Sequence, residues 1–296
     1  MARYLGAHTS DVGGLHMTAR RAGSAGMTAL QIFTAIPKFY GDKSNINPER
    51  VERFRSALAE TDIRPENVVV HAAYVLSVAT ADPAKWERAA AGLAKEMERS
   101  TILGVGQVCF HPGSASDGDP VAAAERVARA MVQALEHTPE SSTRLLVENT
   151  AGAGKTIGRT AEEIALILSH IPKSLRARAG YGLDTCHLHA SGYDIHTSQE
   201  RFTAILDEFE KAIGEPPAFF HLNDSANEFA SNRDRHTNIG EGTIGVEPFR
   251  WLFRDRRSFD VPLILETPEQ NPSPDPDDPS ADPWHVEMLE LLRSFD

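Results

Sequence analysis

Short apolar segments typical of buried β-strands alternate along the whole chain with longer segments of helical pattern. Several of the apolar segments are almost continuous hydrophobic runs, as expected for parallel strands that are covered on both faces. The eight strand candidates lie at residues 3–8, 29–34, 67–72, 107–112, 144–149, 179–184, 218–223 and 262–267. Eight strands that each precede a helix-capable segment predict an α/β fold of the (β/α)8 TIM-barrel type.

The segments between the strands carry signals for the start and end of helices. Asp82 precedes Pro83 as an N-cap before a first-turn proline, and Gly104 lies where this helix should end. Further helix starts are indicated at Pro48, Asp119, Thr160 and Ser198. A doubly wound open sheet is the competing architecture. No G-x-G-x-x-G motif follows the first strand, which removes the usual dinucleotide-binding version of that fold.

We expect a single TIM-barrel domain over residues 1–296. Length alone favours about two domains, but α/β barrels of this size are often one domain. Residues 268–283 depart from the alternation because they are rich in proline and aspartate. We expect an extended or mobile surface loop there, since prolines remove hydrogen-bond donors and the segment has little to bury. Residues 282–295 then predict a last amphipathic helix.

The composition says more about where the protein is located than about what it does. A net charge of −12 argues against a protein coated in positive charge for nucleic acid. It does not exclude a nucleic-acid enzyme, because a cluster of metal cations can reverse the field locally. Cys109 and Cys186 imply no disulfide framework, so we expect a reducing, cytoplasmic location. We find no signal-peptide core and no apolar run of membrane-spanning length, and expect no membrane partner.

Side chains that can bind metal stand at the ends of the last six predicted strands. In a barrel of this type the carboxyl ends of the strands form the active site. Six strands that end in buried charge would be costly unless cations neutralised that charge. Histidine and carboxylate ligands suit zinc, and carboxylates also suit manganese or magnesium. The candidate ligands are His71, His111, Glu148, Asp184, His187, His221, Asp234, His236 and Glu266.

Each candidate also has a structural interpretation. A lone histidine at a strand end is more often a hydrogen-bonded core residue than a ligand, and Asp184 could cap the next helix. The common position of all nine at one end of one barrel favours the metal hypothesis. We interpret His8 as a supporting or structural residue, leave His189 out of the ligand set, and expect Cys186 to pack rather than bind metal. The histidines expected to be solvated are His16, His137, His170, His196 and His285.

The motifs that hold these residues resemble a known family. They run from Gly6 to Pro268 and include GAHTSDVGG, LQIFT, HAAY, CFHPGS, LVENTAG, GLDTCHLHASGYD, FFHLNDS, RDRHTNIGEGTIG and LILETP. In this order they are similar to endonuclease IV, the metal-dependent apurinic/apyrimidinic endonucleases of base-excision repair. The resemblance covers nearly the whole chain. It implies a hydrolase that cuts the phosphodiester 5′ to abasic sites in duplex DNA and also trims blocked 3′ ends.

The resemblance also implies three zinc ions, with manganese acceptable in one or more sites. The first ion would be held by His71, His111 and Glu148, the second by Glu148, Asp184, His221 and Glu266, and the third by His187, Asp234 and His236. Glu148 would then bridge the first two ions, and Glu266 would orient or deprotonate the attacking water. Glu148 and Glu266 are therefore the expected catalytic residues.

Members of the family insert side chains into DNA at the lesion, and the matching positions here are Tyr74, Lys38 and Val75. The chain departs from the family pattern at residues 32–50, where lysine and tyrosine replace the usual arginine and tryptophan. Ala153 also stands where a glutamine is common. Phosphate contacts are expected from basic residues in the loops, each of which alone would more often be a solvated charge. These residues are Lys38, Lys155, Arg233 and Arg235.

Two other functions compete with this interpretation. A sugar isomerase or epimerase on the same barrel would need only one divalent ion, and the four residues of the second set could hold it. Such an enzyme has no need of the remaining five candidate ligands. A DNA-lesion binder without catalytic activity is the other alternative, but a binder need not retain nine metal-ligating side chains.

Overall fold

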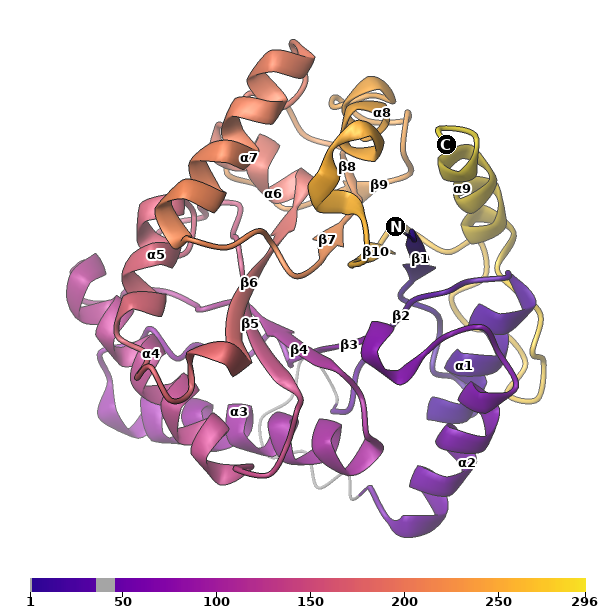
Figure 1. Cartoon of the computed structure of the whole chain (residues 1–296), viewed down its shortest axis with the longest axis horizontal. Coiled ribbons are helices and arrows are strands. Elements are labelled where there is room, and N and C mark those ends of the chain that lie inside the picture. Colours follow the sequence, from indigo (N-terminus) through magenta and orange to yellow (C-terminus); the bar gives the residue numbers. More distant parts are fainter. Residues whose placement is uncertain (1, 36–45) are drawn as a thin grey trace.

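A computed structural model describes residues 2–35 and 46–296 of the chain. Eight parallel strands form one sheet in the order β1-β10-β7-β6-β5-β4-β3-β2, and a bridge between His8 and Gln31 sets β1 beside β2. Helices surround this nearly closed barrel (Figure 1), so the predicted TIM barrel is confirmed. The barrel strands are β1 Tyr4–Ala7, β2 Leu30–Ile32, β3 Val68–His71, β4 Gln107–Phe110, β5 Arg144–Glu148, β6 Ala179–Asp184, β7 Phe220–His221 and β10 Pro262–Leu265.

The helices begin where the sequence signals predict. The Asp82 side chain accepts a hydrogen bond from the Lys85 amide at the start of its helix, and Gly104 adopts the left-handed conformation (φ 79°) at its end. The helices are α1 Leu15–Ser24, α2 Pro48–Ala59, α3 Pro83–Leu103, α4 Pro120–His137, α5 Ala161–Ser169, α6 Thr185–Ser191, α7 Gln199–Ile213, α8 Glu247–Arg254 and α9 Pro283–Arg293. Short 3-10 turns occur at Pro65–Asn67, Arg176–Arg178 and Arg256–Ser258. None of these helices combines the length and apolarity that a bilayer crossing requires.

The interior of the barrel is built in layers by the alternation of side chains along each strand. A lower apolar layer fills the middle of the barrel with Ala29, Val69, Cys109, Leu146, Ala218, Phe219 and Ile264. Phe219 needs a glycine opposite it, because a Cβ on Gly182 would lie 2.0 Å from its ring. The next inward-facing residues toward the carboxyl ends of the strands are polar. The fold therefore places the polar layer of the barrel on top of an apolar floor.

The Pro/Asp-rich segment between β10 and α9 contains no helix or strand. It is attached to α1 through Arg21, a buried residue whose guanidinium donates to the carbonyl oxygens of Asp275 and Asp278, each at 3.1 Å. The same guanidinium donates to the carbonyl oxygens of Ser10 and Val12 at 2.7 Å. One buried cation thus ties the segment to the loop after β1.

His285 corrects one expectation from the sequence. It lies on α9 with no exposed surface, so the prediction that it is solvated is wrong. The amphipathic α9 buries one face made of His285, Met288, Leu289 and Leu292. Spacing of three to four residues places His285 on that face, and the apolar pattern of the helix decides its burial.

Candidate metal centre

The polar layer at the mouth of the barrel brings together residues from strands far apart in the sequence. His71, Glu148, Asp184 and His221 are the last residues of β3, β5, β6 and β7, and Glu266 directly follows β10. Four of these five lie two positions beyond an inward-facing residue of the apolar layer, and Asp184 lies two beyond Gly182, so each side chain points into the barrel. His111 directly follows β4 and is the most exposed of the histidines beside Glu148, with about a quarter of its side chain accessible.

Glu148 occupies the middle of this centre and is fully buried. Its Oε2 lies 3.3 Å from Nε2 of His71 and 3.4 Å from Nε2 of His111. Its Oε1 lies 2.9 Å from Nδ1 of His221 and 3.3 Å from Nδ1 of His187. One carboxylate therefore faces four imidazoles, which is the arrangement expected of a bridging ligand.

The structure groups two of the three predicted ligand sets as units. The potential ligand atoms of Glu148, Asp184, His221 and Glu266 all lie within 4.8 Å of one another, and so do those of His187, Asp234 and His236. The first predicted set is less compact. His71 and His111 both contact Glu148, but His111 groups with Glu148 and His187, whereas His71 groups with Glu148 and Cys109.

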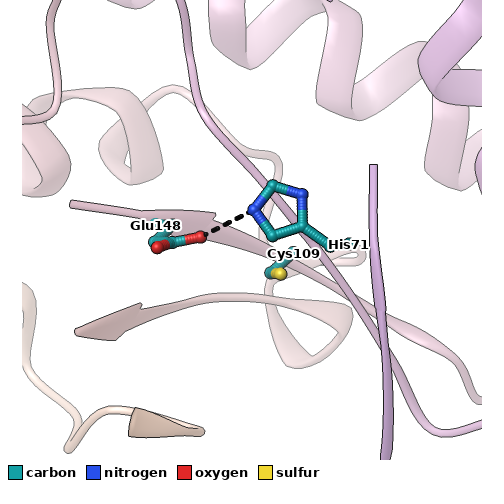
Figure 2. Close-up of side chains that lie close together, drawn as sticks. All are labelled: His71, Cys109 and Glu148. Atoms are coloured by element: carbon teal, nitrogen blue, oxygen red, sulfur yellow. Dashed lines mark ion pairs between the residues drawn. The ribbon is translucent and has the colours of Figure 1, made fainter. Parts of the chain in front are cut away.

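Cys109 is a neighbour that the sequence did not indicate. Figure 2 shows its sulfur close to His71 and Glu148 on the floor of the centre. Burial, reinforced by the charge of Glu148, raises the pKa of the Cys109 thiol well above its usual value. Cys186 lies near Asp184 and His236, and burial raises its pKa to about 12. Both sulfurs are therefore protonated at neutral pH and pack against the ligands as thiols.

A short helix explains how His187 reaches the centre. The Asp184 side chain caps α6 by accepting a hydrogen bond from the His187 amide at 2.8 Å. The structural role considered for Asp184 is therefore correct, and it coexists with the position of Asp184 among the candidate ligands. The turn of helix directs His187 toward Asp234, whose Oδ2 lies 3.2 Å from Nε2 of His187. The other carboxylate oxygen of Asp234 lies 2.9 Å from Nε2 of His236.

His236 is placed by a hairpin that the sequence did not predict. Strands β8 Asp224–Ser225 and β9 His236–Thr237 pair antiparallel. The buried Asp224 carboxylate accepts five backbone hydrogen bonds of 2.7–3.2 Å from the amides of Ser225, Gly240, Gly242, Ile244 and Gly245. This single carboxylate therefore holds the loop after His236 against β8, the first strand of the hairpin.

Several ligand candidates have one ring nitrogen engaged by a backbone carbonyl. Nδ1 of His71 pairs with the Ala72 oxygen at 2.7 Å, and Nδ1 of His187 with the Asn149 oxygen at 2.9 Å. Nδ1 of His236 pairs with the Glu266 oxygen at 3.3 Å. A carbonyl oxygen can only accept a hydrogen bond, so Nδ1 carries the proton in each case. Nε2 of each ring then faces the carboxylates. Metal-binding histidines are typically oriented in this way.

The groups of the centre shift one another's pKa values strongly. Burial by itself lowers the pKa of His221, but the carboxylates of Glu148 and Glu266 outweigh burial and raise it to about 9. Burial and the charge of Glu148 raise the pKa of Glu266, but the imidazoles of His221, His71 and His236 together outweigh them and the pKa falls to about 2. The imidazoles of His221, His111 and His187 likewise outweigh burial and hold the pKa of Glu148 well below its usual value. The carboxylates are therefore ionised and need positive charge beside them.

The donor set fits divalent cations. Among the described residues, three buried atoms of the centre have ion-pair contacts but no hydrogen bond, namely Oε2 of Glu148, Nε2 of His111 and Nε2 of His236. Buried polar atoms without partners are costly in a folded protein. All three belong to ligand types that zinc accepts. Cations at these atoms would satisfy them and neutralise the carboxylates together.

The centre opens into a cavity of about 320 Å³. Its lining residues are His71, Tyr74, His111, His187, Asp234, Arg235, His236, Glu266 and Pro268. The Tyr74 ring is half exposed and packs edge-on to His71, with ring centroids 4.8 Å apart. The phenol therefore stands at the rim, directly beside a candidate ligand.

The remaining predicted DNA contacts are spread around this rim. Arg235 lines the cavity and is exposed, as are Arg233 and Lys155. Lys155 donates to the Ser116 carbonyl oxygen at 3.4 Å, which ties its loop to the loop after β4. Val75 is half-buried and packs against the core. Lys38 lies outside the described residues.

Comparison with curated relatives covers nearly the full chain. A model of the xylose isomerase-like TIM barrel family matches residues 19–295. The probable endonuclease 4 of Trichlorobacter lovleyi is 36% identical over 293 residues, which cover 99% of this chain and 100% of that protein. The probable endonuclease 4 of Chloroflexus aurantiacus is 37% identical over 265 residues, or 89% and 91% of the two chains.

Solved structures agree with the curated relatives. Endonuclease IV from Thermus thermophilus aligns with a TM-score of 0.80 at 32% identity, over 99% of this chain and 98% of that one. A D-tagatose 3-epimerase-like protein aligns with a TM-score of 0.72 over 99% and 96% of the two chains, but its identity of 15% shows a shared fold alone. The resemblance found in the sequence motifs is confirmed. This chain belongs to the endonuclease 4 family, within the xylose isomerase-like TIM barrels.

Proposed function

We propose that this protein is a DNA-repair endonuclease that hydrolyses the phosphodiester 5′ to abasic sites in duplex DNA and removes blocked 3′ ends. The observation that carries the proposal is the position of Glu148, whose two carboxylate oxygens face four histidines at the mouth of the barrel. The names of the relatives, which describe endonucleases, support the same function.

We propose that the centre holds three zinc ions on the three ligand sets, with Glu148 shared between the first two. When bound, zinc lowers the pKa of water so that a nucleophile exists at neutral pH, and it neutralises charge on the phosphate oxygens. The protein contributes the orientation of its carboxylates. Glu266 is held by two amides, at 2.5 Å from Nε2 of Gln31 and 3.2 Å from Nδ2 of Asn223. A carboxylate fixed in this way can orient an attacking water and accept its proton.

Selection of abasic sites would depend on the rim of the cavity. A sugar without a base leaves the duplex at lower cost than a paired nucleotide, because little stacking or pairing is lost. Tyr74 is the exposed aromatic side chain beside His71, and it is placed to occupy the gap in the stack. Val75 follows it in the chain and would be the second inserted side chain. Arg233, Arg235 and Lys155 are exposed and would contact phosphates, as would Lys38.

A sugar isomerase or epimerase is the second candidate. The compact group of Glu148, Asp184, His221 and Glu266 would hold one divalent ion for that chemistry. The group of His187, Asp234 and His236 has no purpose in such an enzyme, and it is equally compact. This second group therefore favours the endonuclease.

The test is incision of a duplex that carries one abasic site, with an intact duplex of the same sequence as the control. The zinc-loaded protein should cut only the abasic duplex, on its 5′ side, and should lose activity after prolonged chelation and regain it with zinc. A protein that binds the abasic duplex without cutting it is a lesion binder. A protein that leaves the DNA intact but interconverts ketoses with one ion per chain is the epimerase. Either result overturns the proposal.

A further inference from the structure

We propose that Gln31 is a positioning residue of the metal centre. Its amide fixes the tautomer of His221 and the orientation of the Glu266 carboxylate, so that both residues present ligand atoms to the same ion. The inference rests on the proposed function in one respect, namely that the centre binds divalent metal. It assigns a task to an uncharged residue of β2, a strand that supplies none of the nine candidate ligands.

The Gln31 side chain is fully buried between the two ligand candidates. Its Nε2 lies 2.5 Å from Oε1 of Glu266, and its Oε1 lies 2.7 Å from Nε2 of His221. The same Nε2 lies 3.2 Å from Nδ1 of His8, the residue that pairs with Gln31 in the bridge that closes the barrel. The amide therefore links three residues of the polar layer.

The chemistry of these contacts leaves one assignment of protons. An ionised carboxylate only accepts, so the NH₂ group of Gln31 must face Glu266. The amide oxygen of Gln31 then faces His221, and an oxygen only accepts, so Nε2 of His221 must carry a proton. Nδ1 of His221 is left toward Glu148 at 2.9 Å and Glu266 at 3.1 Å. His221 can therefore bind metal only through Nδ1 while Gln31 holds it.

His221 differs from the other oriented histidines in the kind of group that orients it. Carbonyl oxygens of the backbone engage Nδ1 of His71, His187 and His236, and no substitution removes a backbone oxygen. The partner of His221 is a side chain, which a substitution does remove. Loss of the partner of a metal-binding histidine typically weakens metal affinity by about 10–100-fold.

Asn223 limits how much is lost with Gln31. Its Nδ2 donates to Oε2 of Glu266 at 3.2 Å and to Oδ2 of Asp184 at 2.6 Å. Glu266 therefore keeps one of its two amide contacts when Gln31 is replaced. We expect weakened binding of one ion rather than collapse of the centre.

The first test measures zinc affinity by competition with a chromophoric chelator. Gln31→Met has a similar length but none of the three polar contacts, and it should lower the affinity for the most affected zinc ion by about 10–100-fold. Gln31→Glu keeps an acceptor for His221 but places a second carboxylate against Glu266, so it should weaken zinc binding as well. Gln107→Met, at the amino end of β4, is the matched control and should bind zinc like the wild type.

The second test begins with the wild-type protein, whose result does not depend on whether a variant folds. Long-range ¹H–¹⁵N spectra of the zinc-loaded protein should show His221 with a proton on Nε2 and metal on Nδ1. Gln31→Met should shift the Nε2 proton as its hydrogen bond is lost, whereas Gln31→Glu should retain that bond. A wild-type spectrum with the proton on Nδ1 overturns the inference.

The outcomes for the two proposals are distinguishable. If the wild type binds zinc and Gln31→Met binds it with unchanged affinity, the role of Gln31 is wrong and the proposed function stands. If the wild type binds no divalent ion, the proposed function itself fails and the inference fails with it.

Discussion

The carboxylate of Glu148 and the imidazole of His221 meet across the mouth of the barrel at 2.9 Å, although 73 positions separate them in the chain. Both are fully buried, and both end strands of the same sheet. The contact exists because alternate side chains point inward and all parallel strands end at the same rim. The ligand candidates at the strand ends converge by register, whereas α6 brings in His187 and the β8–β9 hairpin brings in His236.

Replacement of Glu148 by glutamine should remove catalysis while the barrel stays folded. The substitution conserves shape but removes the negative charge that faces four imidazoles. We expect the rate of abasic-site incision to fall by about 100-fold or more, because a shared ligand and its charge are lost. Glu215→Gln is the matched control, since Glu215 pairs with Arg144 and Arg176 away from the centre. Incision at the wild-type rate would show that Glu148 is not the bridging carboxylate.

Replacement of Asp224 should damage the loop after His236 without touching a candidate ligand. The carboxylate accepts five backbone hydrogen bonds in a fully buried position. In Asp224→Asn an NH₂ group must face some of these amides, so we expect the free energy of unfolding to fall by about 3–5 kcal/mol. Urea denaturation measures this, with Asp207→Asn as the control, since Asp207 is an exposed residue of α7 that pairs with Arg257. Equal losses in both variants would contradict the proposed role of Asp224.

Glu269 gives the protein a testable dependence of stability on pH. Burial raises the pKa of Glu269 to about 7, and the charge of Asp282 adds to the rise. The amide of Ser10, which donates to Glu269 at 2.9 Å, and the charge of Arg21 oppose it. His285, 3.9 Å away, is neutral because burial lowers its pKa. Burial and the nearby negative charge thus outweigh the two neighbours that stabilise the ionised form of Glu269.

The sign of the effect follows from the raised pKa. The ordinary pKa of Glu269 is 4.5, so the stability contributed by its neutral form is complete below that pH and is lost as the pH rises through 7. Glu269→Gln keeps an acceptor for Ser10 and stays neutral. Measured by urea denaturation, it should equal the wild type near pH 4.5 and exceed it at pH 8 by about 1–2 kcal/mol, after allowance for solvent screening. A variant less stable than the wild type at pH 8 would refute this.

Tyr74→Ala should separate DNA recognition from metal binding. Tyr74 is half exposed at the rim and is not a candidate ligand. Loss of an aromatic stacking partner costs about 1–3 kcal/mol per contact, so KM for the abasic duplex should rise by roughly 5- to 150-fold. The zinc content of the variant should equal that of the wild type. A variant with unchanged KM would assign Tyr74 to packing against Phe33 and His71 alone.

The sequence predicts the barrel and the candidate ligands at the strand ends because both depend on simple alternation. Apolar runs mark the strands, and a charged residue at the end of such a run marks the rim. Strand lengths were less predictable: β7 contains Phe220–His221 alone, whereas residues 218–223 were expected. Backbone pairing, which propensity does not describe, decides where a strand ends.

The supporting residues could not be found from the sequence. Gln31 and Asn223 are uncharged amides, and only the register of the closed barrel places them between ligands. Arg21 resembles any helical surface arginine, yet its guanidinium is buried against backbone carbonyls of residues 275 and 278. Every residue has a backbone carbonyl, so the sequence does not show which carbonyls accept hydrogen bonds from Arg21. The hairpin that positions His236 contains two residues per strand, too few for a recognisable pattern.

The number of zinc ions per chain tests the central claim most directly, because the claim is that the centre holds three ligand sets, the first two of which share Glu148. Elemental analysis of the purified, zinc-saturated protein after removal of excess metal should give three ions per chain. A single ion per chain would limit binding to the group of Glu148, Asp184, His221 and Glu266, and it would contradict a centre built around a bridging Glu148.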